Sequence, residues 1–292
     1  MYKSTLSQIP KICFILVFLI IMPAYSWDNT GHKLIATIAY QHLQPTVQSQ
    51  IDQLTKLLDP NHTALQRFLY DSIWLDTLPK NSKGKKPYGS WHFINLPYSV
   101  DHSLNQKPKR KNLLWALQKE QRILQSSYAK PQQKALALRF IIHLAGDAHQ
   151  PLHCISLFSQ RFPHGDAGGN FYIIDDLYVA NLHAYWDEGV GLFRSYGLHY
   201  PLSSKNVHHL AQQIEDEYPL HYFGQTAIDL NFQTWINQSY QLAKDFVYTT
   251  PEDTCPNWRY NQEGRKIVKQ QIALAGYRLA ALLNSVFTGS VK

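Results

Sequence analysis

Apolar residues recur every three to four positions along most of the chain, which is the spacing of helices that bury one face. Asn29 or Thr30 is placed to cap the first expected helix. The buried face of that helix would carry Leu34, Ile35 and Ile38. Further helices are expected at 47–58, 64–78, 112–124, 132–149, 205–217, 226–246 and 262–287. The pattern predicts an all-α chain that forms a single compact domain.

The expected helix at 132–149 is apolar on most sides, which is typical of a buried central helix. It nevertheless carries His143 and Asp147, four residues apart and therefore on one face, and buried polar groups need partners. Pro151 cannot continue the helix, and the turn before it brings His153 back beside the helix end. Imidazoles and a carboxylate suit a metal such as zinc. The alternative is a polar helix end whose histidines face water.

The region 158–191 departs from the helical pattern, because it is rich in glycine and aromatic residues. Its Gly-Gly-Asn sequence at 168–170 is a turn signal, and the apolar run at 171–174 is the best strand candidate. His183 and Asp187 repeat the four-residue spacing on a further expected helix. We therefore expect a small irregular or β-containing insert within the helical domain.

Residues 1–26 are expected to be a secretory signal peptide, because a positively charged start precedes an apolar run at 12–22. That run is short for a membrane span. An Ala-Tyr-Ser triplet fits the cleavage rule, so the mature domain would cover 27–292 and begin at Trp27. An uncleaved N-terminal anchor is the alternative. Cleavage would leave no transmembrane segment and place the protein outside the cell or in a periplasm.

The full chain has 28 basic and 21 acidic residues, a formal charge of +7. Removing Lys3 and Lys11 with the signal peptide, and no acidic residue, lowers this charge to +5. The balance is compatible with a polyanionic substrate but is weak support for one. Cys154 and Cys255 would remain, either paired or free. Two cysteines do not build a thiolate metal site, so the ligands must come from His, Asp, Glu or the chain terminus.

Residues of the kind that bind metals are spread over several separate segments. They are Trp27, His32, Asp76, His92, His143, Asp147, His153, His183 and Asp187. Together with their surroundings they resemble the S1/P1 nuclease family over nearly the whole chain. The segments that carry the resemblance are 27–32, 143–153, 168–170, 181–187, 235–240 and 274–280. The resemblance implies a compact helical domain of the phospholipase C/P1 nuclease type.

The resemblance also implies a zinc-dependent phosphodiester hydrolase. Such an enzyme cuts single-stranded DNA and RNA endonucleolytically and removes 3′-phosphates from nucleotides, and its zinc-activated water gives 5′-phosphate products. Three Zn²⁺ ions are implied per chain. Their ligands would be Asp76, His92, His143 and Asp147 for the first, His153, His183 and Asp187 for the second, and the Trp27 α-amine and carbonyl oxygen, His32 and Asp147 for the third. Asp147 would bridge two ions, and a free Trp27 amine requires signal cleavage.

The implied partner is a single-stranded nucleic acid or a nucleotide, with a monomeric chain and no stable protein partner. Phe93 resembles the base-stacking aromatic residue of the family. Asn95 stands where the family often has Asp, and an amide can both donate and accept hydrogen bonds. Asn170 is the third residue expected to contact the substrate.

Catalytic roles are expected for Asp76 and Asp147, which also bind metal, and for Lys80. The family usually has a basic residue three positions after its first aspartate ligand, where this chain has Pro79. Lys80 follows and is expected to replace that residue as a phosphate contact. A solvent-exposed lysine is the alternative.

Two other functions compete with the nuclease. The zinc-dependent phospholipase C family resembles this fold as well. It tends to place Glu four residues after its last histidine ligand, whereas this chain has Asp187 four residues after His183. It also spaces its second terminal ligand further from the tryptophan, whereas His32 comes five residues after Trp27. A non-catalytic zinc-binding module is the other possibility. Loss of ligands would support it, and none is lost.

Overall fold

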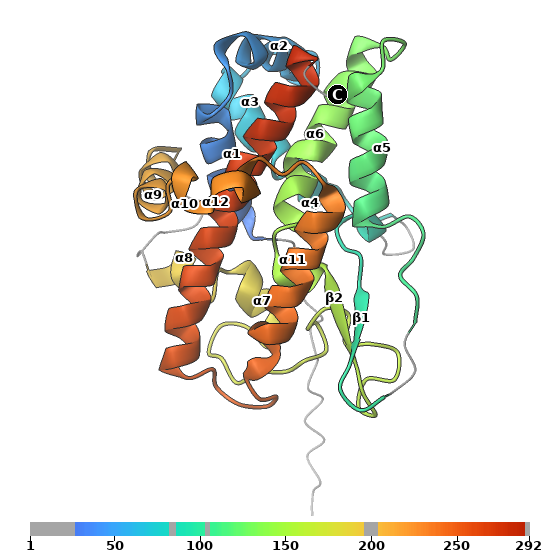
Figure 1. Cartoon of the computed structure of the whole chain (residues 1–292), viewed down its shortest axis with the longest axis vertical. Helices are drawn as coiled ribbons and strands as arrows, with labels where there is room; N and C mark the ends of the chain where they lie inside the picture. Colours follow the sequence, from blue (N-terminus) through green and yellow to red (C-terminus); the bar gives the residue numbers. More distant parts are fainter. Residues whose placement is uncertain (1–26, 82–85, 103–105, 196–203, 290–292) are drawn as a thin grey trace, which may run out of the picture.

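The structure, a computed structural model, describes residues 27–81, 86–102, 106–195 and 204–289. The expected signal peptide at 1–26 lies outside the described residues. The expectation of an all-α fold with a small β-containing part is confirmed (Figure 1). The helices are α1 (Asn29–Gln41), α2 (Pro45–Lys56), α3 (Ala64–Asp71), α4 (Trp74–Thr77), α5 (Leu113–Gln125), α6 (Pro131–Asp147), α7 (Leu182–Asp187), α8 (Leu192–Ser195), α9 (Ser204–Glu217), α10 (Leu220–Phe223), α11 (Phe232–Asp245) and α12 (Trp258–Thr288). The strands are β1 (Leu96–Ser99) and β2 (Ile155–Phe158), and the 3-10 helices η1 to η4 are Gly89–Trp91, Pro151–His153, Gly224–Ile228 and Val247–Thr249.

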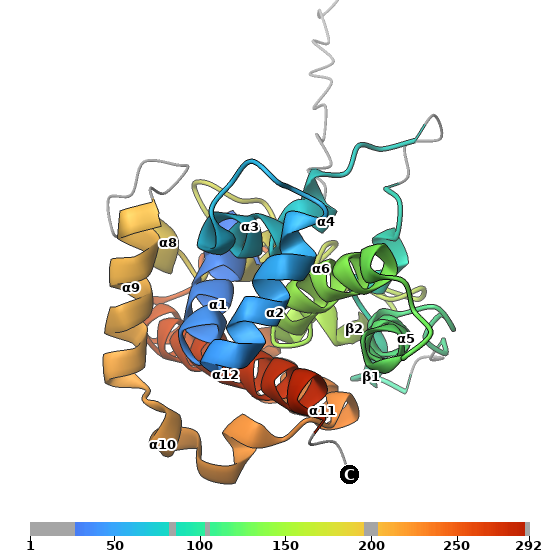
Figure 2. The ribbon, with the colours of Figure 1, turned by 90° about the horizontal axis from the view of Figure 1, so that it is seen from above.

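The helices α1, α6 and α12 pack against one another at the centre of the fold. α1 packs against α12 and also against α6, while α5 packs along α6 on the side away from α1 (Figure 2). The helix expected to be central is α6, and it is buried along its whole C-terminal half, from Ala137 to Asp147. Its apolar side chains contribute to one continuous core, so the polar residues near its C-terminal end are held inside the protein.

The small sheet pairs β1 with β2 in parallel, with Leu96 opposite Ile155 and Ser99 opposite Phe158. α5 and α6 form the long connection between the two strands, as a parallel pair requires. The residues just before each strand, His92 and His153, are therefore brought side by side. The His153 carbonyl accepts a hydrogen bond of 2.9 Å from the Ile94 N–H, one step before the sheet begins.

The expectation of a strand at 171–174 is wrong, because only an isolated bridge forms there. The residues of this segment do alternate between exposed and buried, as in a strand with one buried face. Their backbone bonds join residues 180–182 in a single bridge, however, and others go to the loop at Asp253. The Leu182 N–H donates to Tyr172 and the Asp253 N–H donates to Ile173, so no continuous ladder forms.

The single helix expected at 64–78 is divided into α3 and α4 around Ser72. In a continuous helix the Ser72 carbonyl would accept from the N–H of Asp76. Instead the Asp76 N–H donates to Ile73, and the Ser72 carbonyl accepts from Nδ1 of His143 at 2.7 Å. The break in the helix thus supplies a backbone anchor for the histidine of the central helix.

Two helix starts also differ from expectation. Asp28, rather than Asn29 or Thr30, caps α1, because its carboxylate accepts from the backbone N–H groups of Thr30 and Gly31 at 2.9 and 3.0 Å. α11 begins at Phe232 rather than near 226, because a 3-10 helix occupies the start of the expected segment.

Cys154 and Cys255 are both free in the structure, so the disulfide alternative is not observed. Cys154 is buried, and its thiol lies 3.7 Å from the Ala148 carbonyl oxygen. Burial raises the pKa of this thiol, which keeps it protonated and packed as an apolar side chain.

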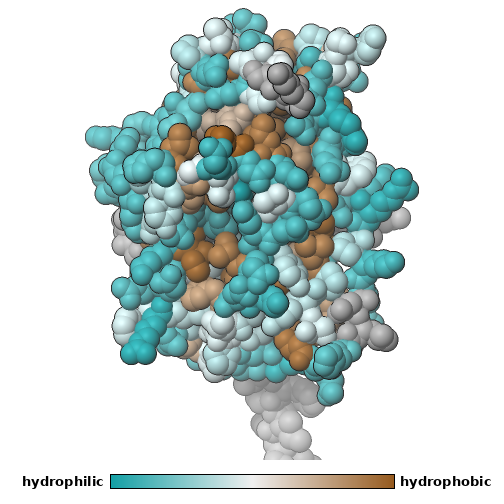
Figure 3. Space-filling view, in the orientation of Figure 1, coloured by the Kyte–Doolittle hydropathy of each residue, from teal (hydrophilic) through white to brown (hydrophobic). Residues whose placement is uncertain are grey.

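The surface is mostly hydrophilic on the face shown in Figure 3, with apolar side chains in small patches. Among the described residues, none of the helices combines the length and apolar character that crossing a bilayer requires.

Candidate metal centre

The turn after α6 assembles the first part of the site. Gln150 is extended, with φ −86° and ψ 114°, and its side-chain oxygen accepts from the Leu152 N–H at 2.6 Å. Pro151 then starts the short 3-10 helix η2, which ends at His153. As expected, the turn brings His153 back to the helix end, where its Nδ1 lies 3.8 Å from Oδ1 of Asp147.

The eight side chains expected to bind metal come together in three groups. Within each group, one ligand atom from every member lies within 4.8 Å of the others. The groups are His32, His143 and Asp147; Asp76, His92 and His143; and His153, His183 and Asp187. Their members come from α1, α4, α6, α7 and the turns after η1 and α6, so segments far apart in sequence converge on one place.

The two carboxylate oxygens of Asp147 face different groups. Oδ1 lies 3.5 Å from Nε2 of His32. Oδ2 lies 3.1 Å from Nδ1 of His92 and 3.3 Å from Nε2 of His143. Opposite charges and hydrogen bonds from these histidines, His143 first, outweigh burial and hold the pKa of Asp147 well below its ordinary value. Asp147 is thus an ionised, fully buried carboxylate with one oxygen available to each side.

Three of the histidines are oriented by backbone carbonyls. Nδ1–H of His143 donates to Ser72 at 2.7 Å, that of His153 donates to His92 at 2.6 Å, and that of His183 donates to Gly168 at 2.5 Å. A carbonyl can only accept, so these bonds place a proton on Nδ1, and in a neutral ring they leave Nε2 as a lone-pair donor. Nε2 of His153 and of His183 is buried and has no hydrogen-bond partner in the described structure. A metal ion would satisfy both nitrogens, so the donor set fits zinc.

Burial sets the pKa of two of these histidines. It lowers the pKa of His32 to about 4, together with the charge of His143, and that of His183 to about 3, together with the charge of His153. Both rings are therefore neutral at physiological pH, which is the form that binds metals. His143 differs, because the charges of Asp147 and Asp76, together with hydrogen bonds to Asp147 and to the Ser72 carbonyl, outweigh burial and raise its pKa to about 9.

The group of His153, His183 and Asp187 contains a buried carboxyl whose charge is favoured by a nearby cation. Burial raises the pKa of Asp187 well above its ordinary value, although Nε2 of Gln150 donates a hydrogen bond of 2.6 Å to Oδ1. The other oxygen lies 3.5 Å from Nε2 of His183. A buried carboxyl of this kind ionises when a positive charge stands beside it. The group of His153, His183 and Asp187 therefore matches a divalent ion in charge as well as in donor type.

The segment that begins at Trp27 is packed directly against this cluster. The fully buried Trp27 donates from its indole Nε1 to the Gly146 carbonyl at 3.1 Å. The backbone N–H of Asp28 donates to the backbone carbonyl of Asp187 at 2.9 Å. The His32 ring stacks on His143 with centroids 4.2 Å apart. A Cβ at Gly146 would lie 2.7 Å from Nδ1 of His32, so this close approach requires glycine.

A buried carboxylate, Asp166, fixes the loop that orients His183. It accepts from the N–H groups of Gly168 and Gly169 at 3.0 and 2.9 Å, and from the Tyr248 hydroxyl at 2.7 Å. Gly168 has φ +66°, and a Cβ there would lie 2.3 Å from a backbone oxygen. Asp166 therefore holds a conformation that only glycine adopts easily, and that conformation presents the Gly168 carbonyl to His183.

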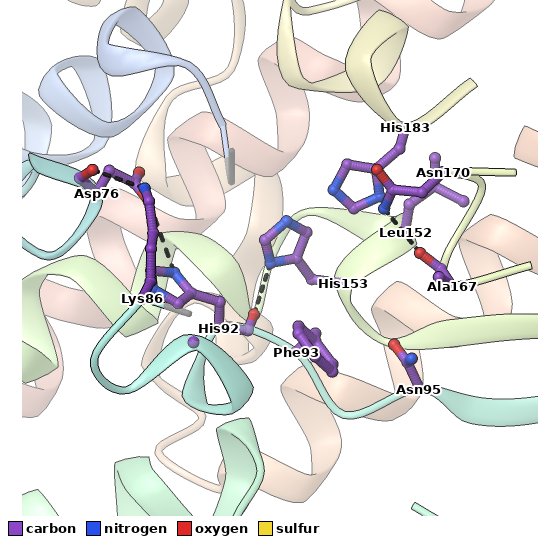
Figure 4. A pocket seen from close by; sticks show the side chains of 11 residues that line it. Asp76, Lys86, His92, Phe93, Asn95, Leu152, His153, Ala167, Asn170 and His183 are labelled. Carbon is purple, nitrogen blue, oxygen red and sulfur yellow. Dashed lines mark hydrogen bonds and ion pairs between the residues drawn. The ribbon is translucent and has the colours of Figure 1, made fainter. Parts of the chain in front are cut away.

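The cluster lies beside a cavity of about 150 Å³. Residues expected to contact the substrate are among those around it: Asp76, Lys86, Gly89, His92, Phe93, Asn95, Leu152, His153, Ala167, Asn170 and His183. In Figure 4, Phe93 and His153 lie between one side with Asp76 and His92 and a second side with His183 and Asn170. Phe93, Asn95 and Asn170 thus line the same cavity as Asp76, His92, His153 and His183.

The lysine at the cavity is Lys86, not Lys80. Nζ of Lys86 donates to the Asp76 carbonyl at 2.7 Å (Figure 4), and burial lowers the pKa of its ammonium group. Lys80 is exposed and is not among the residues around the cavity. The sequence pattern does not distinguish Lys86, because this residue stands in a lysine-rich segment that is typical of a solvated loop.

Comparison with known proteins identifies the family. A family model described as S1/P1 Nuclease matches residues 27–288. The chain belongs to the S1/P1 nuclease family. Nuclease S1 of Aspergillus oryzae is 27% identical over 282 residues, covering 90% of this chain and 92% of the relative. Endonuclease 2 of Arabidopsis thaliana is 26% identical over 281 residues (90% and 91%), and Nuclease P1 of Penicillium citrinum is 28% identical over 167 residues (55% and 57%). The expected family and the expected nuclease class of activity are confirmed.

The Asp166 contacts lead to a prediction. Asparagine has one acceptor oxygen, and its NH₂ group cannot accept from the N–H and O–H donors that surround Asp166. The substitution Asp166→Asn therefore removes several hydrogen bonds at constant size. We expect the free energy of unfolding to fall by about 1–3 kcal/mol and the His183 group to lose metal. Urea unfolding and metal content per chain test both. Tyr248→Phe, which removes one bond to the same carboxylate, is expected to cost about 1 kcal/mol and to keep its metal. Full metal content in Asp166→Asn would contradict the orienting role.

Proposed function

We propose that this S1/P1 nuclease hydrolyses single-stranded DNA and RNA endonucleolytically, removes 3′-phosphates from nucleotides and leaves 5′-phosphate products. The observation that carries the proposal is the convergence of three His/Asp groups at a cavity with an aromatic ring and two amides. The general dependence of this family on zinc supports Zn²⁺ as the cofactor. We further propose a monomeric enzyme with no stable protein partner, exported from the cell and cleaved after residue 26.

Three Zn²⁺ ions are proposed, held as the family resemblance implies. The first would bind Asp76, His92, His143 and Asp147, the second His153, His183 and Asp187, and the third the Trp27 amine and carbonyl oxygen, His32 and Asp147. When bound, such ions supply Lewis acidity, a water of lowered pKa and positive charge for the phosphate. The 3.1 and 3.5 Å contacts on opposite sides of the Asp147 carboxylate support its role as the bridge.

The protein's own contribution is orientation and charge balance. The backbone bonds to Nδ1 hold the rings of His143, His153 and His183 with Nε2 directed into the cluster. The carboxylates of Asp76, Asp147 and Asp187 lie among the histidines and offset cationic charge there. Because the site is largely buried, the positions of these groups are fixed before substrate binds.

Phe93, Asn95 and Asn170 are proposed to bind the nucleotide beside the scissile phosphate. A base can stack on the Phe93 ring irrespective of its identity. Asn95 has a positive φ of 47°, a conformation that Asn tolerates better than most residues, and it lines the same cavity. Its amide offers both a donor and an acceptor, which suits the edges of several bases. Asn170 donates from Nδ2 to the Ala167 carbonyl at 2.8 Å, which leaves its amide oxygen and its second N–H for the substrate.

Substrate hydrolysis separates this proposal from its rivals. We expect purified mature protein to cleave single-stranded DNA, RNA and a 3′-nucleotide, but not phosphatidylcholine. Chelation should abolish turnover, and Zn²⁺ should restore it. Product analysis should find 5′-phosphates. Cleavage of the lipid alone would establish phospholipase C instead, whereas a fully zinc-loaded protein that cleaves nothing would be a non-catalytic zinc-binding module.

We propose Lys86 as a phosphate contact in the place that the sequence assigned to Lys80. We expect Lys86→Met to lower kcat by about 10- to 100-fold without loss of metal, because a charge-assisted hydrogen bond to the reacting group is removed. Lys80→Met removes the same charge from an exposed position and should change kcat by less than about 2-fold. Steady-state kinetics on a 3′-nucleotide, with metal content measured in parallel, compare the two. A loss confined to Lys80→Met would restore Lys80 as the catalytic lysine.

The N-terminal ligand can be tested by blocking it. A short protease-removable extension ahead of Trp27 converts the amine into an amide, which no longer donates a lone pair. We expect metal content to fall from three to two ions per chain and most activity to be lost. Proteolytic removal of the extension, verified by N-terminal sequencing, should restore both. Three ions in the extended protein would refute the terminal ligand.

A further inference from the structure

A run of basic side chains immediately precedes α5. Residues 107–111 read Lys-Pro-Lys-Arg-Lys, and no acidic residue occurs between Asp101 and Glu120. All four cations are exposed, and none of them forms an ion pair within the part of the chain that the structure describes. Four unneutralised charges in five residues make this segment a strong local source of positive potential.

The basic segment is attached to the strip of chain that borders the cavity. The Leu113 N–H donates to the Phe93 carbonyl at 3.0 Å, and the Ser90 hydroxyl donates to the Lys111 carbonyl at 2.9 Å. Asn112 caps α5 through its side-chain oxygen, and its NH₂ donates to the Lys109 carbonyl at 2.8 Å. In Figure 1 the chain reaches the base of α5 alongside β1, which continues directly from the cavity residues. The cations therefore lie next to the site, on a backbone that is fixed to it.

The cavity alone is too small for a polynucleotide. Its volume of about 150 Å³ lies below the roughly 300–1,000 Å³ of ordinary ligand pockets, so only part of one nucleotide fits inside. The other phosphates of a long strand must pass over the surface. Five extended residues span at most about 17 Å, which is enough to face several phosphates of a single strand. Lysine and arginine in an exposed, irregular segment bind such phosphates without reading the sequence.

We propose that residues 107–111 bind the sugar–phosphate backbone of single-stranded nucleic acid beyond the nucleotide in the cavity. This inference rests on the proposed nuclease function and adds a subsite for long substrates. The segment raises the efficiency of polynucleotide cleavage and leaves hydrolysis of a 3′-nucleotide unchanged, because a mononucleotide has no further phosphates to contact. The contribution is electrostatic and decreases with salt.

The test compares long and short substrates. A variant with Lys107, Lys109, Arg110 and Lys111 all changed to Gln is assayed on a 30-nucleotide oligo-dT and on 3′-AMP, at 50 and 200 mM salt. We expect kcat/KM on the oligonucleotide to fall about 10-fold or more at the lower salt, with 3′-AMP hydrolysis within about 2-fold of wild type. The slope of log kcat/KM against log salt should become shallower by about 0.7 for each lost phosphate contact.

A matched control removes the same number of charges elsewhere. Lys56, Lys205, Lys244 and Arg259 are exposed and lie on α2, α9, α11 and α12. Changing these four to Gln alters the net charge equally but should leave the salt slope and oligonucleotide cleavage close to wild type. Binding of fluorescent oligo-dT to the metal-free protein, followed by anisotropy, gives a readout that does not depend on activity.

Several outcomes would overturn the subsite. Equal losses in the two quadruple variants would show an effect of net charge alone. A parallel loss on 3′-AMP would show that the substitutions damage the cavity. Unchanged oligonucleotide binding, together with lost binding to phosphatidylserine-containing vesicles, would make the segment a membrane contact. If wild-type protein cleaves neither substrate, the proposed function fails, and the anisotropy comparison still decides whether the segment binds nucleic acid.

Discussion

Burying a cluster of imidazoles and carboxylates in a helical core is favourable only when their polar atoms have partners. In this protein the partners are divided between two sources. Backbone carbonyls accept from Nδ1 of His143, His153 and His183. The inward nitrogens are left for the cluster itself, where the His/Asp groups have the donor types that zinc prefers. A carbonyl within a regular helix already accepts a hydrogen bond from the helix itself. The carbonyls that orient the histidines therefore come from places where a helix is interrupted or has ended, or from a loop.

Each irregular piece of backbone near the site provides such a carbonyl. The break after α3 provides Ser72, the turn after η1 provides His92, and the loop held by Asp166 provides Gly168. These segments are short and lie between regular elements whose apolar faces fix their ends. The central helix α6 then contributes two side chains one turn apart, and the turn at Pro151 contributes a third. Regular structure gives rigidity, and its interruptions give hydrogen-bonding capacity.

Contacts encoded by local spacing were predictable from the sequence, and contacts made through the main chain were not. The pair His143 and Asp147 follows from helical periodicity, and the core position of α6 follows from its composition. The role of the Ser72 carbonyl has no signature in the sequence, because every residue carries a backbone carbonyl. The pairing of β1 with β2 was missed for a related reason: both strands are short and their partner lies far away in sequence. Lys86 was missed because only the fold distinguishes it from its lysine neighbours.

One contact links two metal-binding groups mechanically. His92 offers its ring to one group, while its carbonyl orients the His153 ring of another at 2.6 Å. Ordering this residue for one ion therefore removes part of the conformational entropy that the second ion would otherwise have to overcome. If the proposed ions bind, we expect their loading and their loss to be cooperative. We then expect the protein to pass between an empty and a filled state over a narrow range of free metal.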